Sequence, residues 1–265
     1  MQIELDVALD PTLGCGQAHR WKKEDGVWKG VIGNNVITLT QTENGFEFEG
    51  CDRNLLLDYF RHGDDLSSII NEISGKDDFV ADLALKCPGL RILKQDPWEC
   101  TATYILATNA NVKRIGKMVE SVCSTFGTDL GEAYSFPSPG QILDKSDCIE
   151  DCRLGYRTER FLGFARMVDE GEFNLKELMK ADYGECVTEL KKVPGVGPKV
   201  ADCTALFAFG HLESFPVDVR ISKIMKEVYG VEGNNEKIAE AGRRMFGRYA
   251  GYAQELLYHS GEIPS

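Results

Sequence analysis

The chain has 265 residues, enough for two domains or one large domain, and its hydrophobic content of 43% is typical of a soluble globular protein. No apolar run approaches the length that crosses a membrane, and the start Met1-Gln2-Ile3-Glu4 is not a signal peptide, so we expect no membrane partner. The formal net charge of −12 argues against a nucleic-acid partner, although residues 186–226 contain 6 basic and 4 acidic residues and allow a local anion-binding surface.

The nine cysteines are scattered along the chain, and only Cys148 and Cys152 lie close together. The sequence has no C-x-x-C motif and no disulfide-like framework, which favours a reducing compartment. We therefore expect a cytoplasmic protein.

Residues 1–50 are expected to form strands. Ile3, Leu5 and Val7 alternate with polar residues. Turn-forming residues separate three further runs: 27–32, 36–40 and 46–48. Asn-Gly between alternating runs favours a hairpin, so this segment predicts an antiparallel meander with one face packed on helices.

The rest of the chain has helical patterns. Residues 54–90 predict short helices, to which we assign no chemistry. Asp96-Pro97-Trp98-Glu99 offers an N-cap acid, Pro at the first helical position and Glu at the third, a capping box that predicts a helix to about Ala107. We therefore predict an α+β fold: an antiparallel β domain with short helices over residues 1–90, and an all-α domain over residues 91–265.

Two polar helix starts carry candidate nucleic-acid contacts. Asn109 and Arg114 open the next helix, where such side chains can hydrogen-bond an unpaired base, but Asn109 is equally well explained as an N-cap. Tyr156 and Arg157 precede another helix. A tyrosine ring there can fill the gap that a base leaves while the arginine holds the base's former partner, although a Tyr packed on a helix end is the simpler interpretation.

The most informative stretch begins with Pro194-Gly195-Val196-Gly197. Proline fixes φ and each glycine can take positive φ, so this segment predicts a tight turn, with Pro198 as the first residue of the following helix. Backbone N–H groups and the helix dipole would then face an anion such as phosphate. The turn alone is as readily a plain connector. Lys199 beside it, and Asp218 as the expected cap of the next helix, make the pattern more specific.

These residues resemble the signature of the helix-hairpin-helix DNA glycosylases, and the surrounding sequence is most similar to their 8-oxoguanine DNA glycosylase branch. The resemblance rests on Pro-Gly-Val-Gly-x-Lys-Val-Ala-Asp-Cys at residues 194–203 and Pro-Val-Asp at residues 216–218. It covers most of the chain, is strongest over residues 95–258 and is weaker in the strands. It implies a partner, double-stranded DNA containing an oxidised guanine, and base excision with Lys199 as the nucleophile.

The resemblance also implies a base pocket. The carbonyl of Gly16, within a Gly-Gln-x-x-Arg-Trp segment, would accept a hydrogen bond from the N7–H that oxidised guanine has and guanine lacks; in isolation Gly16 is simply a turn glycine. Gln254 would bond the Watson–Crick edge of the flipped base, and Tyr258, four residues later on the same helical face, would stack on it. Cys203 is assigned to the same pocket.

By the same resemblance, other residues would contact the DNA backbone or the unpaired base. Asn109, Arg114, Tyr156 and Arg157 would hold the site of the missing base. The hairpin glycines Gly195 and Gly197 would approach a phosphate. Arg220 stands where relatives usually have a His that contacts phosphate, a departure that puts details of the pocket in doubt.

The implied reaction makes demands on two residues. Lys199 can attack only when neutral, and burial, nearby cations or the helix N-terminus could lower its ordinary pKa of about 10.4. Asp218 would stay ionised as an N-cap and stabilise positive charge on the sugar or shuttle a proton. An amine nucleophile gives a Schiff base at C1′ that permits β-elimination, so the interpretation predicts both glycosylase and abasic-site lyase activity.

Two alternatives stay open at this point. One is a related glycosylase for another damaged base, such as an alkylated one; the other is a non-catalytic helix-hairpin-helix DNA-binding module. Some relatives carry a four-cysteine iron–sulfur cluster after the catalytic region, but here the last cysteine is Cys203, so we expect no such cluster, no metal and no other cofactor. The hairpin carbonyls could hold a monovalent cation. We expect a monomer.

Overall fold

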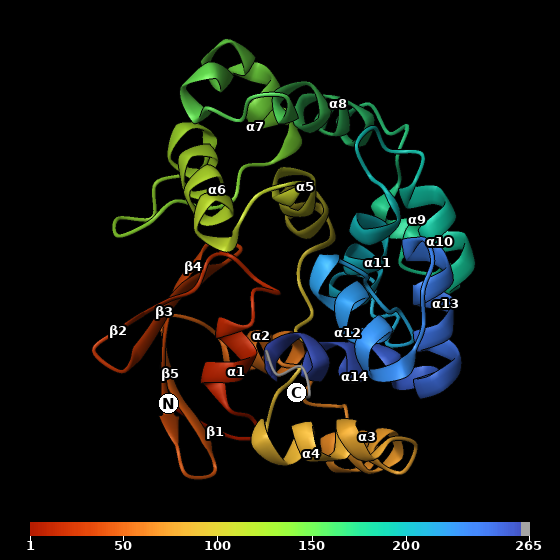
Figure 1. Ribbon diagram of the computed structural model, residues 1–265. Helices are drawn as coiled ribbons and strands as arrows, with labels where there is room; N and C mark the ends of the chain where they lie inside the picture. The colour runs from red at the N-terminus through yellow and green to blue at the C-terminus, as the bar shows by residue number, and fades with distance from the viewer. Residues whose placement is uncertain (261–265) are drawn as a thin grey trace.

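The computed structural model describes residues 1–260, in which an antiparallel sheet lies beside a larger helical body (Figure 1). The five-stranded sheet has the order β1-β5-β4-β3-β2. Its strands are β1 (Gln2–Glu4), β2 (Lys22–Glu24), β3 (Val27–Ile32), β4 (Asn35–Thr42) and β5 (Gly45–Glu49). Trp28 of β3 pairs with Leu39 of β4, as the two-residue turn between these strands requires.

The helices account for most of the remaining chain. Before the central region they are α1 (Leu9–Gly14), α2 (Arg53–Tyr59), α3 (Leu66–Ser74) and α4 (Asp78–Lys86). The central ones are α5 (Pro97–Ala107), α6 (Val112–Phe126), α7 (Pro139–Asp144), the 3₁₀ helix η1 (Ser146–Cys152), α8 (Arg157–Asp169) and α9 (Leu175–Leu178). The last are α10 (Tyr183–Leu190), α11 (Pro198–Phe207), α12 (Val219–Tyr229), α13 (Asn235–Phe246), the 3₁₀ helix η2 (Gly247–Tyr249) and α14 (Ala250–Ser260).

The predicted α+β class is confirmed, with one correction near the N-terminus. Residues 9–14 form helix α1 where strands were expected. Leu9 and Leu13 are four residues apart, and both are buried in the apolar core between the sheet and α2. Helical spacing therefore allows this short segment to bury two large side chains on one side, which a strand would not do.

The apolar core of the molecule has two parts. The smaller one joins the sheet to α1 and α2, and the larger one runs through the helices from α3 to α14. Helices α3 and α4 pack against α14, so these N-terminal helices contribute to the larger core. The division of the chain at residue 90 stays a prediction.

The start of α5 departs from the expected capping box. Asp96 caps the helix as predicted, since its Oδ1 accepts a hydrogen bond from the Glu99 N–H at 2.8 Å. The side chain of Glu99 turns instead toward Arg20, with 3.7 Å between Nη1 and Oε1. Burial raises the pKa of Glu99 to about 7, and Arg20 counteracts this shift. The reciprocal bond is lost because Arg20 offers the carboxylate a charged partner.

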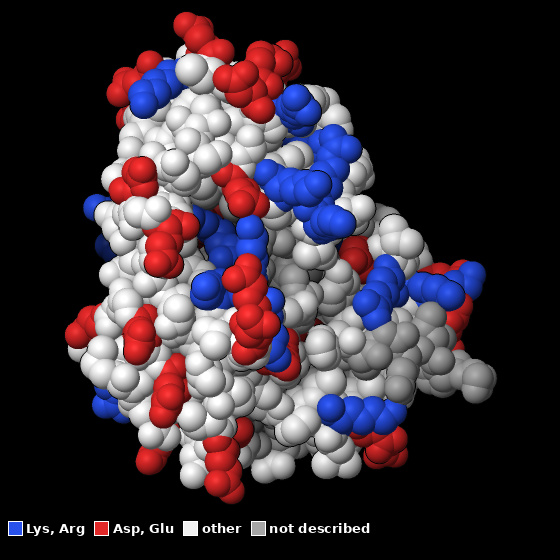
Figure 2. Space-filling model, turned by 90° about the vertical axis from the view of Figure 1, so that its left-hand side faces the viewer, with Lys and Arg blue, Asp and Glu red and all other residues white. Residues whose placement is uncertain are grey.

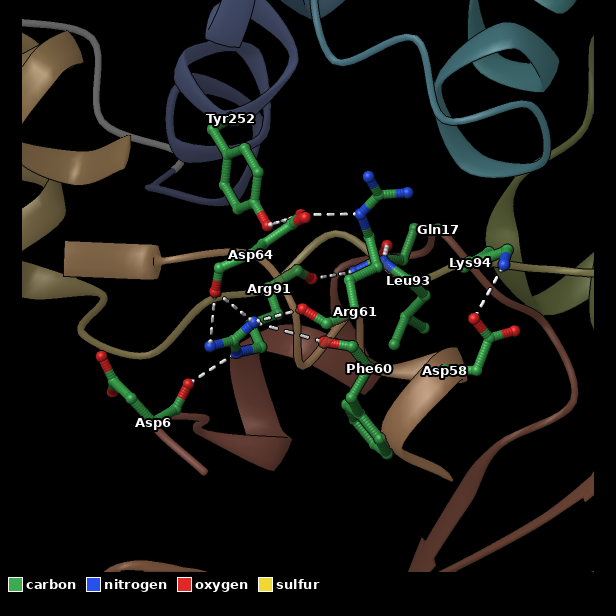
Figure 3. Close-up of polar contacts among 10 residues, drawn as sticks. All are labelled: Asp6, Gln17, Asp58, Phe60, Arg61, Asp64, Arg91, Leu93, Lys94 and Tyr252. Carbon is green, nitrogen blue, oxygen red and sulfur yellow. Dashed lines mark hydrogen bonds and ion pairs between the residues drawn. The ribbon is translucent and has the colours of Figure 1, made fainter. Parts of the chain in front are cut away.

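A buried arginine connects the sheet region to the helical body (Figure 3). Arg91 is 3% exposed, and its guanidinium donates to the carbonyls of Asp6 at 2.7 Å, Arg61 at 2.9 Å, and Phe60 and Asp64 at 3.4 Å each. These carbonyls come from two segments, residue 6 and residues 60–64, that are far apart in the sequence and far from Arg91 itself. The guanidinium therefore fixes the chain that leads from the sheet into α5.

Candidate active site

One cavity collects all the residues predicted for catalysis and base recognition. Its walls include Lys199 and Cys203 of α11, Asp218 before α12, Gln254 and Tyr258 of α14, and Gly16 after α1. The cavity contains about 390 Å³ of space not filled by atoms, including its open mouth. Residues separated by more than 230 positions therefore meet at one site.

The predicted helix-hairpin-helix segment is present. Helix α10 ends at Leu190, and α11 begins at Pro198 with Gly197 as its N-cap, without a side-chain capping hydrogen bond. Gly195 has a φ of +90°, and a Cβ there would lie 2.4 Å from Cδ of Arg160. Only glycine fits this position without displacing Arg160. The turn therefore requires glycine here both for its positive φ and for lack of space for a side chain.

Lys199 and Asp218 lie at the starts of two helices that border the cavity. Lys199 is the second residue of α11 and is exposed at the cavity mouth. Asp218 caps α12, where its Oδ1 accepts a hydrogen bond from the Ile221 N–H at 2.8 Å. The cap fixes the position of the carboxylate at the start of α12.

The pKa of the Lys199 amine is raised above its ordinary value in the free protein. The largest cause is Cys203, desolvation by the cavity walls acts in the opposite direction, and Asp218 raises this pKa further. Burial raises the pKa of the Cys203 thiol to about 12, while Lys199 lowers it. The expected lowering for Lys199 is therefore not found, because its acidic neighbours outweigh the effect of desolvation.

Helix α14 forms the opposite wall. Gln254 is 3% exposed, and its Oε1 has no hydrogen-bond partner within the described residues. Tyr258, half-buried, lies one turn later, as the predicted pairing requires. The guanidinium of Arg220 lies 5.2 Å from the centre of the Tyr258 ring. Arg220 is thus a cavity neighbour that supports the expected stacking surface.

The loop after α1 brings Gly16 to the cavity. Gly16 has a φ of +93°, which favours glycine. The next residue, Gln17, is buried, and its amide donates to the carbonyls of Thr12 at 2.8 Å and Arg91 at 2.9 Å. Its Oε1 accepts from the Leu93 N–H at 2.8 Å. Gln17 therefore anchors the loop and holds Gly16 in place.

Three of the predicted DNA-contacting residues meet between α5 and α8. The Asn109 amide donates to Tyr156 Oη at 3.2 Å, and that hydroxyl donates to the Thr108 carbonyl at 2.9 Å. The Arg157 guanidinium lies 4.4 Å from the centre of the Tyr156 ring. Tyr156 is 51% exposed and is therefore accessible from solvent; its contact with DNA stays a prediction.

The structure refines the expectations for this cluster. Asn109 is not an N-cap: it has a φ of +51°, and Asn111 caps α6 by accepting from the Arg114 N–H at 2.9 Å. Arg157 is only 2% exposed and donates to the Thr108 carbonyl through Nε at 3.0 Å. In the free protein Arg157 therefore shapes the loop that carries Asn109. Its direct contact with an unpaired base stays a prediction.

Arg114 lies on the exposed first turn of α6. The start of this helix borders the cavity region, because Val112 Cγ2 would lie 3.6 Å from a Cβ placed on Gly16. Figure 2 shows Lys and Arg side chains gathered in and above a hollow on one face, next to a strip of Asp and Glu. A molecule with a net charge of −12 thus has local basic surface.

Sequence reasoning missed several cavity residues: Cys15, Gln17, Tyr104, Phe207, Pro216 and Glu255. Glu255 directly follows Gln254 and is 4% exposed. Adjacency to a predicted base-reading residue was the available signal. His19 does not line the cavity, but burial and the nearby Lys199 lower its pKa to about 4, so its imidazole is neutral at pH 7.

Comparison with known proteins decides the family. A family model described as 8-oxoguanine DNA glycosylase, N-terminal domain, matches residues 2–101. The N-glycosylase/DNA lyase OGG1 of Arabidopsis thaliana is 31% identical, over 98% of this chain and 78% of its own length. The chain belongs to the 8-oxoguanine DNA glycosylase family.

Solved structures of this family share the whole fold. The apo form of the Clostridium acetobutylicum 8-oxoguanine glycosylase/lyase has a TM-score of 0.93 at 28% identity, covering 97% of this chain and 94% of that one. Its complex with double-stranded DNA containing cytosine opposite 8-oxoG has a TM-score of 0.91 at 28% identity, covering 96% and 91%. The arrangement of sheet and helices is therefore that of the family.

Two negative observations apply to residues 1–260. No group of three or more His, Cys, Asp or Glu side chains in this range is placed to bind a metal ion. None of its helices is both long and apolar enough to cross a membrane.

Proposed function

We infer that this chain is an 8-oxoguanine DNA N-glycosylase with associated abasic-site lyase activity. It acts on double-stranded DNA, removes the oxidised base and can then break the strand at the resulting site. The observation that carries this function is the single cavity that joins Lys199 and Asp218 to Gly16 and Gln254. Family membership alone does not fix the roles of individual residues, so these roles are part of the proposal.

Base removal begins with a nucleotide that has rotated out of the duplex, because its C1′ is otherwise unreachable. The neutral amine of Lys199 attacks C1′, and the electron pair of the N-glycosidic bond leaves with the base, which takes up a proton. Asp218 stabilises the positive charge that develops on the sugar. The raised pKa of Lys199 means that the amine must lose a proton on the way to this step.

Strand cleavage follows from the same covalent bond. Opening of the sugar ring converts the C1′ adduct into a Schiff base, which makes the C2′ proton acidic. Loss of that proton expels the 3′ phosphate by β-elimination, and water then releases Lys199. One amine thus accounts for both activities.

The surface around the cavity is proposed to hold the DNA. The hairpin of Gly195 and Gly197 receives a backbone phosphate at the uncapped start of α11. Tyr156 enters the gap left by the base, and Asn109 and Arg114 contact the unpaired partner. We further propose that the protein acts as a cytoplasmic monomer without a metal or organic cofactor, and that the hairpin carbonyls hold a monovalent cation.

Borohydride trapping on a duplex with one 8-oxoguanine opposite cytosine tests this proposal. Wild-type protein should form a lesion-dependent covalent adduct, and Lys199→Gln should bind the duplex without trapping or excising. The matched control is Lys192→Gln, an exposed hairpin lysine paired with Glu189 at 2.6 Å, which should trap normally. Trapping retained by Lys199→Gln would refute the nucleophile assignment. Base release without any adduct would indicate water as the nucleophile, and an adduct only on alkylated DNA would indicate another lesion.

A further inference from the structure

Two unpartnered acceptor oxygens belong to consecutive residues of α14 that both line the cavity. Within residues 1–260, Gln254 Oε1 and Glu255 Oε2 are among the few buried side-chain atoms without a hydrogen-bond partner. Both residues line the cavity and are at least 96% buried, with 3% and 4% exposed. Burying a polar atom without a partner destabilises a protein, and a ligand that enters the cavity can supply the missing partner.

The surroundings of Glu255 place its carboxyl near the reacting end of the cavity. The Cys15 thiol, which donates to the Thr12 carbonyl at 3.4 Å, lies close enough to this carboxyl to lower its pKa, and Lys199 and Asp218 interact with it electrostatically from the starts of α11 and α12. Because Lys199 attacks the sugar, a group near Lys199 lies near the edge of the base that faces the sugar. Within residues 1–260, Oε2 of Glu255 has no hydrogen-bond partner, so it can accept from a bound base.

The chemistry of two neighbouring acceptors limits what they can bind. A guanine-type base presents two neighbouring donors, the ring N1–H and the exocyclic 2-amino group, and the 2-amino group lies on the sugar-facing edge. An adenine-type base presents an acceptor at N1 and has no 2-amino group. An adenine-type base would therefore place a lone pair opposite one of the two oxygens and no donor opposite the other.

We propose that Glu255 is a specificity-determining residue that accepts a hydrogen bond from the 2-amino group of the flipped base, while Gln254 accepts from N1–H. Together they select guanine-type bases, and the Gly16 carbonyl separates the oxidised form from the normal one. This assignment rests on the proposed function, because it presumes that a flipped base occupies the cavity. Burial raises the pKa of Glu255 to about 7, so above neutral pH it offers a charged acceptor, which makes a stronger bond than a neutral one.

The test removes each side of the proposed bond in turn. Single-turnover excision is measured on two duplexes that carry 8-oxoguanine or 8-oxohypoxanthine opposite cytosine; the second base lacks only the 2-amino group. Wild type is compared with Glu255→Met, which keeps the side-chain length without an acceptor, and with Glu255→Gln, which keeps a weaker one. Glu240→Met, an exposed change on α13, is the matched control. Thermal melting checks that each variant is folded.

Wild type and Glu240→Met should excise 8-oxoguanine about 10- to 100-fold faster than 8-oxohypoxanthine, the effect of one charge-assisted hydrogen bond. This preference should fall below about threefold in Glu255→Met and take an intermediate value in Glu255→Gln. An unchanged preference in a folded Glu255→Met would overturn the assignment. Equal slowing on both bases would also overturn it, because it would mean that Glu255 acts through Lys199 and not on the 2-amino group. Failure of wild type to trap on 8-oxoguanine would refute the proposed function, which is a separate outcome.

Discussion

Two buried polar regions lie on either side of the loop that carries Gly16, and they are opposite in kind. Around Arg91, four backbone carbonyls accept from one guanidinium, and the Gln17 amide is fully bonded as well. In the cavity, Gln254 and Glu255 each bury an oxygen that no group of residues 1–260 completes. The hydrogen bonds of the first region hold chain segments together, whereas the second region has acceptors that a bound ligand could satisfy.

The contrast gives a physical criterion for function. Both regions bury an ionisable side chain to a similar extent, so burial alone does not separate structure from chemistry. Satisfaction of hydrogen bonds does separate them: a completed network rigidifies the fold, whereas an incomplete one costs stability that a substrate can restore.

Replacing Arg91 should damage stability rather than chemistry. Arg91→Met leaves four carbonyls without their donor, and we expect the free energy of unfolding to fall by about 3–5 kcal/mol. Chemical denaturation followed by circular dichroism measures this loss. Arg248→Met is the matched control, since Arg248 is exposed, pairs with Glu72 and lies over the Tyr249 ring, and it should cost less than about 1 kcal/mol. Equal losses for the two variants would contradict a structural role for the Arg91 network.

Replacing Asp218 should have the reverse outcome. Asn caps helices as well as Asp, so Asp218→Asn should keep the folded stability while it slows base excision about 100- to 1,000-fold through loss of the negative charge beside the sugar. Asp182→Asn changes the N-cap of α10 in the same way, where Oδ1 accepts from the Glu185 N–H at 2.9 Å, and should leave the rate unchanged. Single-turnover rates and melting curves together measure both effects. Wild-type rates in Asp218→Asn would reduce Asp218 to a cap.

Local sequence signals predicted most of the frame of the site. The hairpin at residues 194–197, the cap at Asp218 and the helical spacing of Gln254 and Tyr258 depend on neighbours a few positions away, and the structure places them as expected. Helix α1 was missed because its six residues carry few helical cues, and its burial depends on the distant sheet. Tertiary packing decided that segment.

The electrostatics of the site were not readable from the sequence. The helix start at Lys199 favours a lower pKa, but Cys203 and Asp218 reverse the direction once the fold brings charges together. Arg157 has the pattern of an exposed contact residue, yet it is buried because the Thr108 carbonyl accepts its guanidinium. Both outcomes depend on three-dimensional partners that spacing does not encode.

The pH dependence of stability tests the incomplete region directly. Burial raises the pKa of Glu255 to about 7 in the folded protein, above the ordinary 4.5, although the Cys15 thiol and Lys199 act in the opposite direction and Asp218 adds to the rise. The folded state thus holds this proton more tightly than the unfolded chain, and its stabilising effect is lost as pH rises through about 7. Glu255→Gln removes the titration, so at pH 8 it should be more stable than wild type by up to about 3 kcal/mol, with the difference vanishing near pH 4.5.

Wild type and Glu255→Gln must be compared at each pH, because burial also raises the pKa of Glu99 to about 7. Glu99 therefore gives both proteins the same fall in stability as the pH rises. Urea denaturation between pH 4.5 and 8 measures the difference, and Glu240→Gln on the exposed face of α13 supplies the control with no pH-dependent gain. Addition of a duplex with an uncleavable 8-oxoguanine analogue should stabilise wild type more than Glu255→Gln, because the base completes the carboxylate that the variant lacks. If the difference in unfolding free energy between wild type and Glu255→Gln did not change with pH, the Glu255 carboxyl would already have its hydrogen-bond partners in the free protein. Glu255 would then resemble Arg91, and the contrast between the two buried regions would not hold for it.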